Sequence, residues 1–377
     1  MAAMSASHHA KVTLERILGT IYGNCAGDAI GLLTEFMNKE VANQNYGKFK
    51  KLEYEQKVPD MHRQRWETGD WTDDSDQMIL IMQSLRDNDG KVIELSCTKC
   101  RQANPVDFGS RIKKWMMEGF EELGDFGGMG IGATTLGVLS HEKFDAAPCE
   151  AAESIWIQTG RFVAPNGSVM RTSILGIHDY RDMDKVISNT KEICRTTHYD
   201  PRCQASCVAV TTAIAMMLQG QKKHMKKEGK INVEAVIADS YNYAKECLTE
   251  PEQIEELRFH MYAKNLDVLN LEEYKKIGYC YKCMGSGFWA LRQKDFRKAL
   301  QALVMEAGDA DTNGAVAGAM LGCKLGVSKL PDSWVKGFCH KDWLDKQIAE
   351  YLPVLDKVLE NGADDSLLTA FETRGTA

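Results

Sequence analysis

The sequence has little that would build a β-sheet and little that would interrupt a helix. No segment alternates apolar and polar residues for long enough to predict a strand, and only 8 of the 377 residues are proline. No repeat of solenoid length is present either. These absences exclude sheet-based and repeat architectures. Because apolar residues recur at helical spacing instead, the sequence predicts an all-α protein.

The chain also lacks an apolar leader and an uninterrupted membrane-spanning run. Residues 1–10 are polar, so no secretory signal is expected. The longest uncharged stretch, 203–221, approaches membrane-spanning length, but Gln, Ser and Thr side chains interrupt it. We expect a buried helix there and no membrane contact. The twelve irregularly spaced cysteines fit free thiols in a reducing compartment, which favours a cytoplasmic protein.

Basic residues are not in excess. The net charge of −7 and the isoelectric point of about 5.8 argue against nucleic acid as the main partner. An acidic protein that binds an anionic ligand needs local compensation, either from metal ions or from backbone amides.

The helical segments fit one domain over residues 12–360, between a flexible tail at 1–11 and a polar, frayed tail at 361–377. Residues 222–282 are rich in charge and are expected to form a solvated helical insertion or lid. The predicted helices are Leu14–Ile30, Gln77–Arg86, Pro105–Glu118, Ala146–Gln158, Asp182–Thr196, Cys203–Gln219, Val233–Leu248, Phe296–Ala307, Asn313–Lys324 and Trp343–Leu359.

Two of these segments carry glycine at every fourth position. The first series is Gly19, Gly23, Gly27 and Gly31, and the second is Gly314, Gly318, Gly322 and Gly326. Each glycine costs about 0.5–1 kcal/mol relative to alanine in a helix, so both series need a structural reason. Spacing of four places each series on one face, where another backbone can approach closely. If the two faces pack together, Asp28 comes near Asp309 and Asp311.

Two clusters of oxygen-bearing side chains stand at predicted helix starts. Thr72, Asp73 and Asp74 form the first, and Asp309, Asp311 and Thr312 form the second. Capping of each helix is the alternative interpretation, since Thr and Asp are preferred N-caps. However, each cluster has more carboxylates than a cap requires, and Ser75 and Asp76 remain for that role. We therefore expect the clusters to be two halves of one site for a hard cation.

Further segments could contact an anionic ligand. Residues 124–137 form a glycine-rich loop that runs into a helix, where backbone N–H groups can surround a phosphate. No strand precedes this loop and no Gly-Lys-Ser/Thr follows it, so neither a Rossmann fold nor a P-loop is supported. Asn166-Gly167 is a turn dipeptide followed by Ser168, and His198 precedes a proline turn. Taken singly, these features are more often structural.

Together, and in this order, the motifs resemble those of the ADP-ribosylglycohydrolase family. The resemblance extends from about Leu14 to Gly326. The motifs that carry it are Gly23-x-x-x-Gly27-Asp28-Ala29-x-Gly31, Thr72-Asp73-Asp74-Ser75, the glycine-rich loop, Asn166-Gly167-Ser168-x-Met170-Arg171, Thr197-His198-x-Asp200-Pro201 and Gly308-Asp309-x-Asp311-Thr312-x-Gly314.

The resemblance implies a compact orthogonal helical bundle with a central cleft for two Mg²⁺ ions, with Mn²⁺ as an alternative. Glu35 matches a glutamate that members acting on serine-linked ADP-ribose use near the metals. The family's metal ligands correspond to Thr72, Asp73, Asp74, Asp309, Asp311 and Thr312. The implied substrate contacts are Gly128, Gly130, Gly132 and Thr134 for the pyrophosphate, and Asn166, Gly167, Ser168 and His198 along the ADP-ribose cleft.

The implied reaction is Mg²⁺-dependent hydrolysis at the ribose C1″, which releases ADP-ribose from a modified protein side chain. Asp74 or Glu35 would activate water or protonate the leaving group. The motifs at 166–171 and 197–201 favour an arginine linkage, whereas Glu35 favours serine-linked or O-acetyl substrates. The alternatives are a non-catalytic ADP-ribose-binding or crystallin-like protein and a two-metal phosphohydrolase. The expected partners are ADP-ribosylated proteins or ADP-ribose derivatives, and a monomer is expected.

Overall fold

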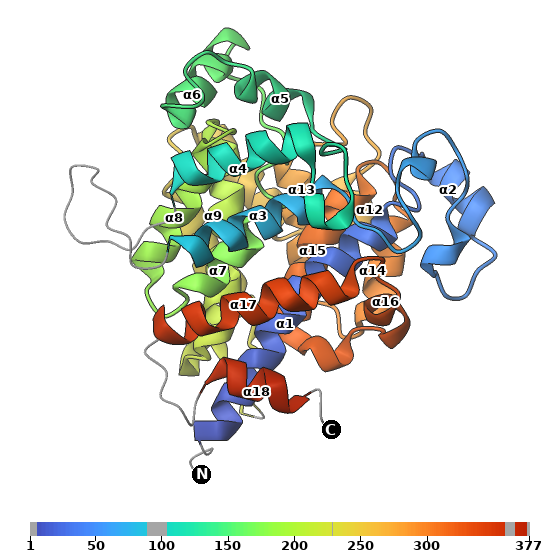
Figure 1. The fold of residues 1–377 in the computed structure, drawn as a ribbon, viewed down its shortest axis with the longest axis vertical. Coiled ribbons are helices and arrows are strands. Elements are labelled where there is room, and N and C mark those ends of the chain that lie inside the picture. The colour runs from blue at the N-terminus through green and yellow to red at the C-terminus, as the bar shows by residue number, and fades with distance from the viewer. Residues whose placement is uncertain (1–5, 89–103, 228, 359–365, 375–377) are drawn as a thin grey trace.

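The computed structural model describes residues 6–88, 104–227, 229–358 and 366–374, and within them the chain is all-α, as the sequence predicts (Figure 1). Apart from helices, these residues contain two isolated β-bridges, Pro165 to Tyr279 and Met225 to Ile231. The α-helices are α1 (Ala6–Gly31), α2 (Lys39–Tyr46), α3 (Asp73–Asp87), α4 (Pro105–Glu118), α5 (Ala133–Leu139), α6 (Pro148–Gln158), α7 (Leu175–His178), α8 (Met183–Arg195), α9 (Pro201–Gln219), α10 (Val233–Lys245), α11 (Pro251–Met261), α12 (Leu266–Leu269), α13 (Cys280–Leu291), α14 (Phe296–Val304), α15 (Ala310–Leu325), α16 (Asp332–Lys336), α17 (Lys341–Val358) and α18 (Leu367–Arg374).

Short 3₁₀ turns join several of these helices. They are η1 (Tyr54–Gln56), η2 (Arg63–Arg65), η3 (Glu121–Leu123), η4 (Thr172–Ile174), η5 (Lys222–His224) and η6 (Val327–Lys329).

Four of the eight prolines mark helix starts. Pro105, Pro148, Pro201 and Pro251 open α4, α6, α9 and α11, at the position where a missing backbone N–H costs nothing. At α4 and α9 the preceding residue also caps the helix, since the Asn104 and Asp200 side chains accept hydrogen bonds from backbone N–H groups of the first turn.

The ends of the chain differ from expectation. Helix α1 begins at Ala6, within the predicted N-terminal tail, and α18 forms within residues 361–377, which were predicted to be frayed. Helix α18 packs against α1 and α17. Its start is fixed by Asp356, which accepts hydrogen bonds from the Leu367 N–H at 2.7 Å and the Ser366 hydroxyl at 2.7 Å. This long-range cap is absent from any local sequence pattern.

Residues 222–282 contain both solvated and core-forming parts. Helix α10 packs on α9, and α11 packs on α13. Val236, Ile237, Leu257 and Met261 are buried in the hydrophobic core. The charged residues occupy the outer faces of these helices, while the end of the segment, at Gly278, reaches the candidate site described below.

The centre of the protein is an antiparallel pair formed by α1 and α15. The two glycine series face each other, as predicted: a Cβ built on Gly19, Gly23 or Gly27 would lie 2.2, 2.3 or 1.9 Å from the carbonyl oxygen of Gly322, Gly318 or Gly314. Gly31 stands in the same way against Ala310. The backbones therefore touch directly, and only glycine permits this approach.

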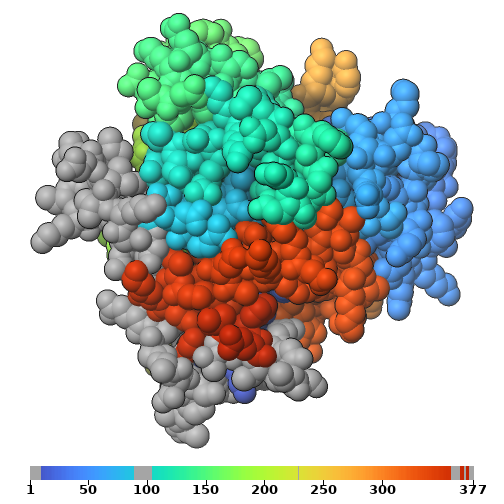
Figure 2. All heavy atoms as spheres, viewed as in Figure 1, coloured from blue at the N-terminus to red at the C-terminus, as the bar shows by residue number. Residues whose placement is uncertain are grey.

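The other helices surround this pair. Helices α13 and α14 pack against α15, and α9 is enclosed by α7, α8, α10 and α13. Helix α3 lies between α4 and α17, and in the space-filling view α17 lies next to the α3 and α4 region (Figures 1 and 2). Helix α9, which covers the longest uncharged stretch, is buried from Ala205 to Leu218. Among the described residues, none of the helices combines the length and apolarity needed to span a bilayer.

The glycine contact can be tested with one added methyl group. We expect Gly23→Ala to lower the free energy of unfolding by about 1–3 kcal/mol or more, because overpacking outweighs the gain of about 0.5–1 kcal/mol in helix propensity. Gly137→Ala in α5 is the matched control, since a Cβ there meets no atom within 4 Å. In urea unfolding, we expect Gly137→Ala to have a larger free energy of unfolding than the wild type. Equal stability of Gly23→Ala and the wild type would contradict the close backbone contact.

Candidate functional site

The first acidic cluster is held at the N-terminus of α3 by a carboxylate from α1. Asp28 accepts hydrogen bonds from the backbone N–H and hydroxyl of Thr72, both at 3.0 Å, and from the N–H and hydroxyl of Ser75 at 3.0 and 2.6 Å. The side chain of Thr72 makes no capping hydrogen bond to α3. Asp28 therefore caps α3 from outside, a role that we expected of Ser75 and Asp76. Asp76 instead accepts hydrogen bonds from the indole N–H groups of Trp71 and Trp115.

The second cluster is held at the start of α15 by the glycine contact and by a short backbone pairing. The Phe36 N–H donates to the Gly308 carbonyl at 2.7 Å, and the Gly308 N–H donates to the Met37 carbonyl at 3.0 Å. Gly308 has a φ of +68°, which favours glycine. This pairing joins the segment that follows α1 to the residue immediately before Asp309.

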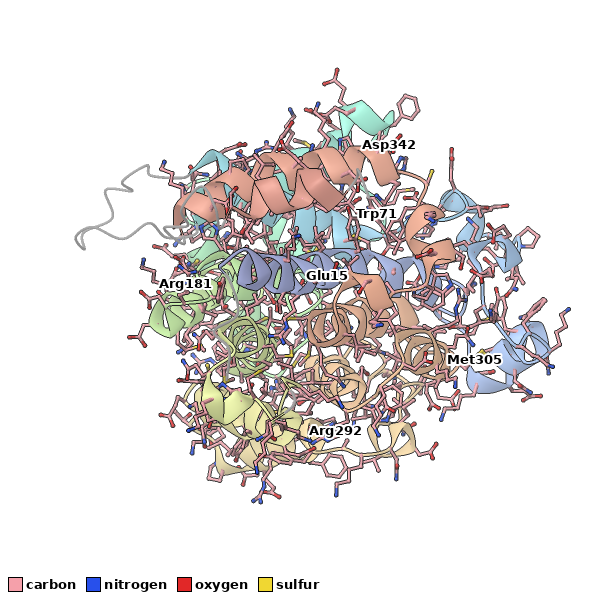
Figure 3. All side chains as sticks on the ribbon, turned by 90° about the horizontal axis from the view of Figure 1, so that it is seen from below. Glu15, Trp71, Arg181, Arg292, Met305 and Asp342 are labelled. Atoms are coloured by element: carbon pink, nitrogen blue, oxygen red, sulfur yellow. The ribbon has the colours of Figure 1, made fainter. Side chains whose placement is uncertain are left out.

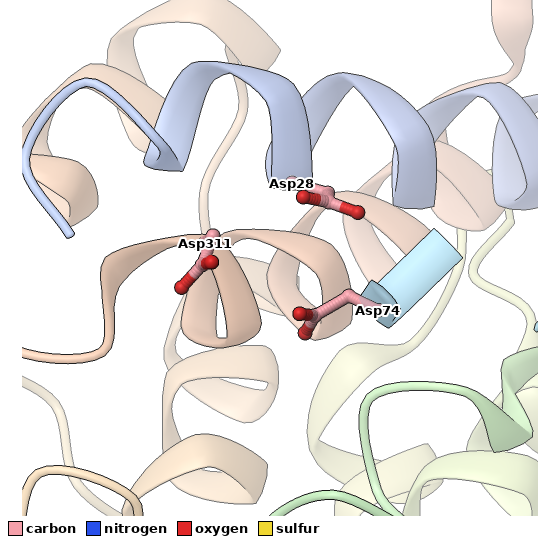
Figure 4. A group of neighbouring side chains, drawn as sticks. All are labelled: Asp28, Asp74 and Asp311. Atoms are coloured by element: carbon pink, nitrogen blue, oxygen red, sulfur yellow. The ribbon is translucent and has the colours of Figure 1, made fainter. Parts of the chain in front are cut away.

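The two clusters meet in space. Carboxylate oxygens of Asp28, Asp74 and Asp311 lie within 4.8 Å of one another (Figure 4), and so do those of Glu35, Asp309 and Asp311. Asp311 belongs to both groups. One oxygen of Asp74, Oδ1, is buried and has no hydrogen-bond partner. A buried carboxylate oxygen without a donor is costly, and a cation would satisfy it.

The pKa values of the clustered carboxylates also favour a bound cation. Burial raises the pKa of Asp28 to about 7. Burial, together with the neighbouring acidic side chains, raises the pKa values of Asp73, Asp74 and Asp311 well above the ordinary value. Like charges in a desolvated site cannot all ionise without a counter-charge. The residues therefore fit hard divalent cations, which prefer carboxylate and hydroxyl oxygens.

Glu35 stands at the edge of these carboxylates and is held from two sides. Its carboxylate Oε2 lies 2.5 Å from His62 Nε2. Its backbone carbonyl accepts a hydrogen bond from Arg63, whose Nε also donates to the Leu33 carbonyl at 2.9 Å. The next residue, Phe36, has a φ of +58° and an exposed ring. Glu35 is thus fixed beside Asp309 and Asp311 while its chain turns sharply toward solvent.

A cleft of about 340 Å³ opens over the carboxylates. On one side the glycine-rich loop passes so close that a Cβ on Gly130 would lie 2.3 Å from Asp73 Oδ1. On the other side Asn166 donates from Nδ2 to Asp309 at 2.8 Å. The predicted site residues that line this cleft are Glu35, Asp73, Asp74, Gly130, Gly132, Thr134, Asn166, Gly167, His198, Asp309, Asp311 and Thr312.

Three predicted residues lie elsewhere. Thr72 is buried behind the cleft, where its hydroxyl lies 3.0 Å from Asp74 Oδ2. Gly128 packs on the Trp115 indole, which a Cβ would approach to 2.7 Å. Ser168 is fully buried, and its hydroxyl lies 3.4 Å from the sulfur of Cys194. Gly128 and Ser168 thus lie behind the residues that line the cleft, and their contact with substrate stays a prediction.

Other residues on the wall were not singled out from the sequence. Phe36, Ile277 and Gly278 also line the cleft. Gly278 is brought in because its carbonyl accepts a hydrogen bond from the Asn166 N–H at 3.0 Å, next to the bridge between Pro165 and Tyr279. Nothing in the sequence marks this pairing of distant loops. By contrast, the sequence did point to Asp28, because this residue lies within the first glycine series.

His198 is kept neutral by its surroundings. Burial, and then the charge of Arg171, lowers its pKa well below the ordinary value. Its Nδ1 lies 2.7 Å from the Thr197 hydroxyl, which also accepts a hydrogen bond from Arg171 at 2.6 Å. A neutral imidazole fixed in this way presents its other nitrogen near Gly167 as a hydrogen-bonding group and not as a charge.

A second, largely apolar cavity of about 310 Å³ adjoins the cleft. The two share Ala133, Thr134, Pro165 and His198. Apolar and aromatic side chains, which include Ile155, Trp156, Val163 and Tyr199, form most of the rest of the second cavity, and Asp200, Thr159 and Thr197 also line it. A polar, cation-binding cleft therefore continues into a pocket suited to a flat apolar group.

Comparison with known proteins shows which proteins this chain is similar to. A family model described as ADP-ribosylglycohydrolase matches residues 9–364. An uncharacterized protein of Archaeoglobus fulgidus is 24% identical over 88% of this chain and 94% of its own length. The ADP-ribosyl-[dinitrogen reductase] glycohydrolase of Rhodospirillum rubrum is 21% identical over 85% and 89%, respectively.

Two further similarities cover most of the chain. The ADP-ribosylarginine hydrolase Tri1 of Serratia proteamaculans is 20% identical over 90% of this chain and 76% of its own length. A solved structure described as an ADP-ribosylglycohydrolase-related protein complex superposes with a TM-score of 0.63 at 21% identity, over 92% of this chain and 99% of that one. The structural likeness supports the helical fold.

Removing the shared carboxylate tests the cation site. We expect Mg²⁺ or Mn²⁺ to raise the Tm of the wild type and to leave that of Asp311→Asn nearly unchanged. Asp342→Asn is the control, because Asp342 is exposed on α17 (Figure 3). Protons compete for carboxylates whose pKa values are raised, so the metal-induced shift should be larger at about pH 8 than at about pH 6. A full Tm shift in Asp311→Asn would contradict the assignment.

Proposed function

Because the chain belongs to the ADP-ribosylglycohydrolase family, we propose that it hydrolyses the glycosidic bond at the ribose C1″ of ADP-ribosylated protein side chains. The observation that carries this proposal is the pair of carboxylate groups that share Asp311 at the floor of a cleft. A non-catalytic ADP-ribose-binding or structural protein would have no need to retain these repelling charges.

We propose Mg²⁺ as the cation, held by both clusters. Asp73, Asp74, Asp309, Asp311 and Thr312 face the cleft or its floor, with Thr72 behind Asp74. Two bound Mg²⁺ ions would supply Lewis-acid polarisation and a water of lowered pKa. The oxygen-only donor set favours Mg²⁺ or Mn²⁺ over softer metals.

Glu35 is the proposed proton carrier. It lies within the group that contains Asp309 and Asp311, while His62 and Arg63 fix its position. It can hold a proton for the leaving group, or take one from the attacking water, at its carboxylate oxygen. Asp74 is the alternative, but its unpartnered Oδ1 is better explained as a cation ligand.

The two adjoining cavities fit the remaining parts of the substrate. The distal ribose would lie over the carboxylates, with the pyrophosphate along Gly130, Gly132 and Thr134. The adenine would enter the apolar cavity beside Trp156 and Tyr199. This order places the modified side chain at the opposite end, beside Glu35 and the exposed ring of Phe36.

An arginine linkage is our first choice for the modified side chain, supported by the similarity to the relative named ADP-ribosylarginine hydrolase. A serine or O-acetyl linkage is the second choice, because Glu35 occupies the position beside the carboxylates from which it can serve an oxygen leaving group.

The assay that tests this function measures free ADP-ribose released from arginine-linked and serine-linked peptides. We expect Mg²⁺-dependent release from at least one of them, with faster turnover of the arginine linkage. EDTA should abolish it, and Asp311→Asn should lower kcat by about a hundredfold or more, because the shared carboxylate orients both cation groups. Asp342→Asn should retain full activity.

The product identifies the bond that is cut. AMP and ribose phosphate in place of intact ADP-ribose would show a phosphohydrolase. Release undiminished by EDTA, or no release from any of the linkages, would contradict the proposed function.

The placement of adenine is tested by filling its cavity. We expect Val163→Trp to raise KM about tenfold with little change in kcat, because the cavity contributes binding that is equal in the ground and transition states. The variant should keep the wild-type Tm shift with Mg²⁺. Val106→Trp, at an exposed position on α4, should leave KM unchanged. An unaltered KM in Val163→Trp would place the adenine elsewhere.

A further inference from the structure

A separate cavity of about 680 Å³ lies at the opposite end of α15 from the carboxylates. Because α15 has 16 residues, its two ends are about 22 Å apart. In Figure 3, Arg292 on this cavity and Trp71 beside the first acidic cluster lie on opposite sides of α1. The cavity is lined by Arg16, Lys226, Gly229, Lys230, Ile231, Val233, Glu234, Arg292, Lys294, Lys324 and Leu325.

The lining is strongly cationic in a protein whose net charge is −7. Six of these side chains are Lys or Arg, and Glu234 is the one carboxylate among the described lining residues. Glu234 pairs with Arg292 at 3.1 Å. Arg292 is thus paired, whereas Arg16, Lys226, Lys294 and Lys324 have no carboxylate partner among the described residues that line the cavity.

Three of the cations, Lys324, Arg16 and Arg292, are held by hydrogen bonds to neutral carbonyl groups. Lys324 donates to the Leu291 carbonyl at 2.8 Å, and Arg16 donates to the Met217 carbonyl. Arg292 donates to the Phe288 carbonyl at 3.1 Å in addition to its pair with Glu234. These contacts hold the charged ends of the three side chains against backbone carbonyl groups. Since carbonyl groups carry no net charge, the contacts leave the cavity positive.

The outer cations come from two other segments. Lys226 and Lys230 lie within the small hairpin that is closed by the bridge between Met225 and Ile231, and Lys294 lies between α13 and α14. All three are exposed at the rim. Burial, and then the charges of Lys294 and Lys226, lowers the pKa of Lys324 to about 8. Lys294 and Lys226 at the rim are thus close enough to repel the charge of Lys324 on the floor, and a bound anion would relieve this repulsion.

The shape narrows the class of anion. None of the described lining residues is aromatic, so the cavity offers nothing on which a nucleobase could stack. Its concave form, with charge on the floor and around the rim, suits a compact ligand better than an extended strand or a membrane surface. Lysine ammonium groups bind phosphate well as point charges.

We propose that this cavity is a binding site for a small anion that carries two or more phosphate groups. Four segments converge on it, so one phosphate contacts the floor at Lys324 and Arg16 while another contacts Lys226 and Lys294 at the rim. This ligand is separate from the substrate of the cleft, which binds at the other end of α15.

Calorimetry with inorganic tripolyphosphate tests the site in the full-length protein. EDTA is included so that the cleft holds no cation that could attract phosphate. We expect one-to-one binding, with much weaker binding of inorganic phosphate. The double variant Lys226→Gln plus Lys294→Gln should weaken tripolyphosphate binding at least about tenfold, since two charge contacts are lost.

The control is a matched pair of exposed lysines outside the cavity, Lys114→Gln plus Lys346→Gln, which should change the affinity by less than about twofold. Asp311→Asn should bind tripolyphosphate like the wild type. Absence of binding, equal weakening by both lysine pairs, equal affinity for phosphate, or displacement by ADP-ribose would each overturn the proposal. Because none of these readouts involves turnover, they are independent of the proposed hydrolase activity.

Discussion

The direct backbone contact between α1 and α15 is the constraint on which the rest of the structure depends. Glycine at every fourth position lets the carbonyl oxygens of one helix fill the space where the other would carry side chains. The contact continues from Gly19 to Gly31, which leaves little freedom to slide or rotate the pair. Its last step, Gly31 against Ala310, brings Asp28 of α1 and Glu35, which follows α1, close to Asp309 and Asp311 at the start of α15.

This rigid pair explains how the protein tolerates so many carboxylates in one place. Asp28 serves as a cap for α3, so the first cluster is attached to the pair through hydrogen bonds at both of its oxygens. The remaining carboxylates are held near one another although burial and repulsion raise their pKa values. Stability lost at this site is offset by the close-packed helices around it, and bound cations would recover part of it.

Much of this architecture follows from sequence patterns with local physical causes. Helices with a polar face or an N1 proline, such as α4 and α9, begin and end close to where the sequence places them. The two glycine series predicted close helix contacts, because each glycine lowers helix stability and needs a structural reason, and packing of the two series against each other was one of the possibilities. Helix α13 was missed because every residue from Cys280 to Leu291 is buried, so no polar face reveals its period.

The parts of the site whose functional residues are neighbours in the sequence could be predicted. The parts that depend on contacts between distant segments could not. The two Thr/Asp clusters stand out because they contain more carboxylates than caps need. By contrast, Gly278 joins the cleft through the backbone of Asn166, and His62 reaches Glu35 through space. The roles of Gly128 and Ser168, which support the wall from behind, also depend on neighbours that only the fold brings together.

The most direct test of the central claim is to locate the cations. Anomalous difference maps from crystals grown with Mn²⁺ should show two peaks in the cleft, on either side of Asp311. One peak should lie toward Asp74 and the other toward Asp309 and Glu35. A single peak, or peaks away from Asp311, would contradict the account in which the α1 and α15 contact unites two acidic clusters into one cation site.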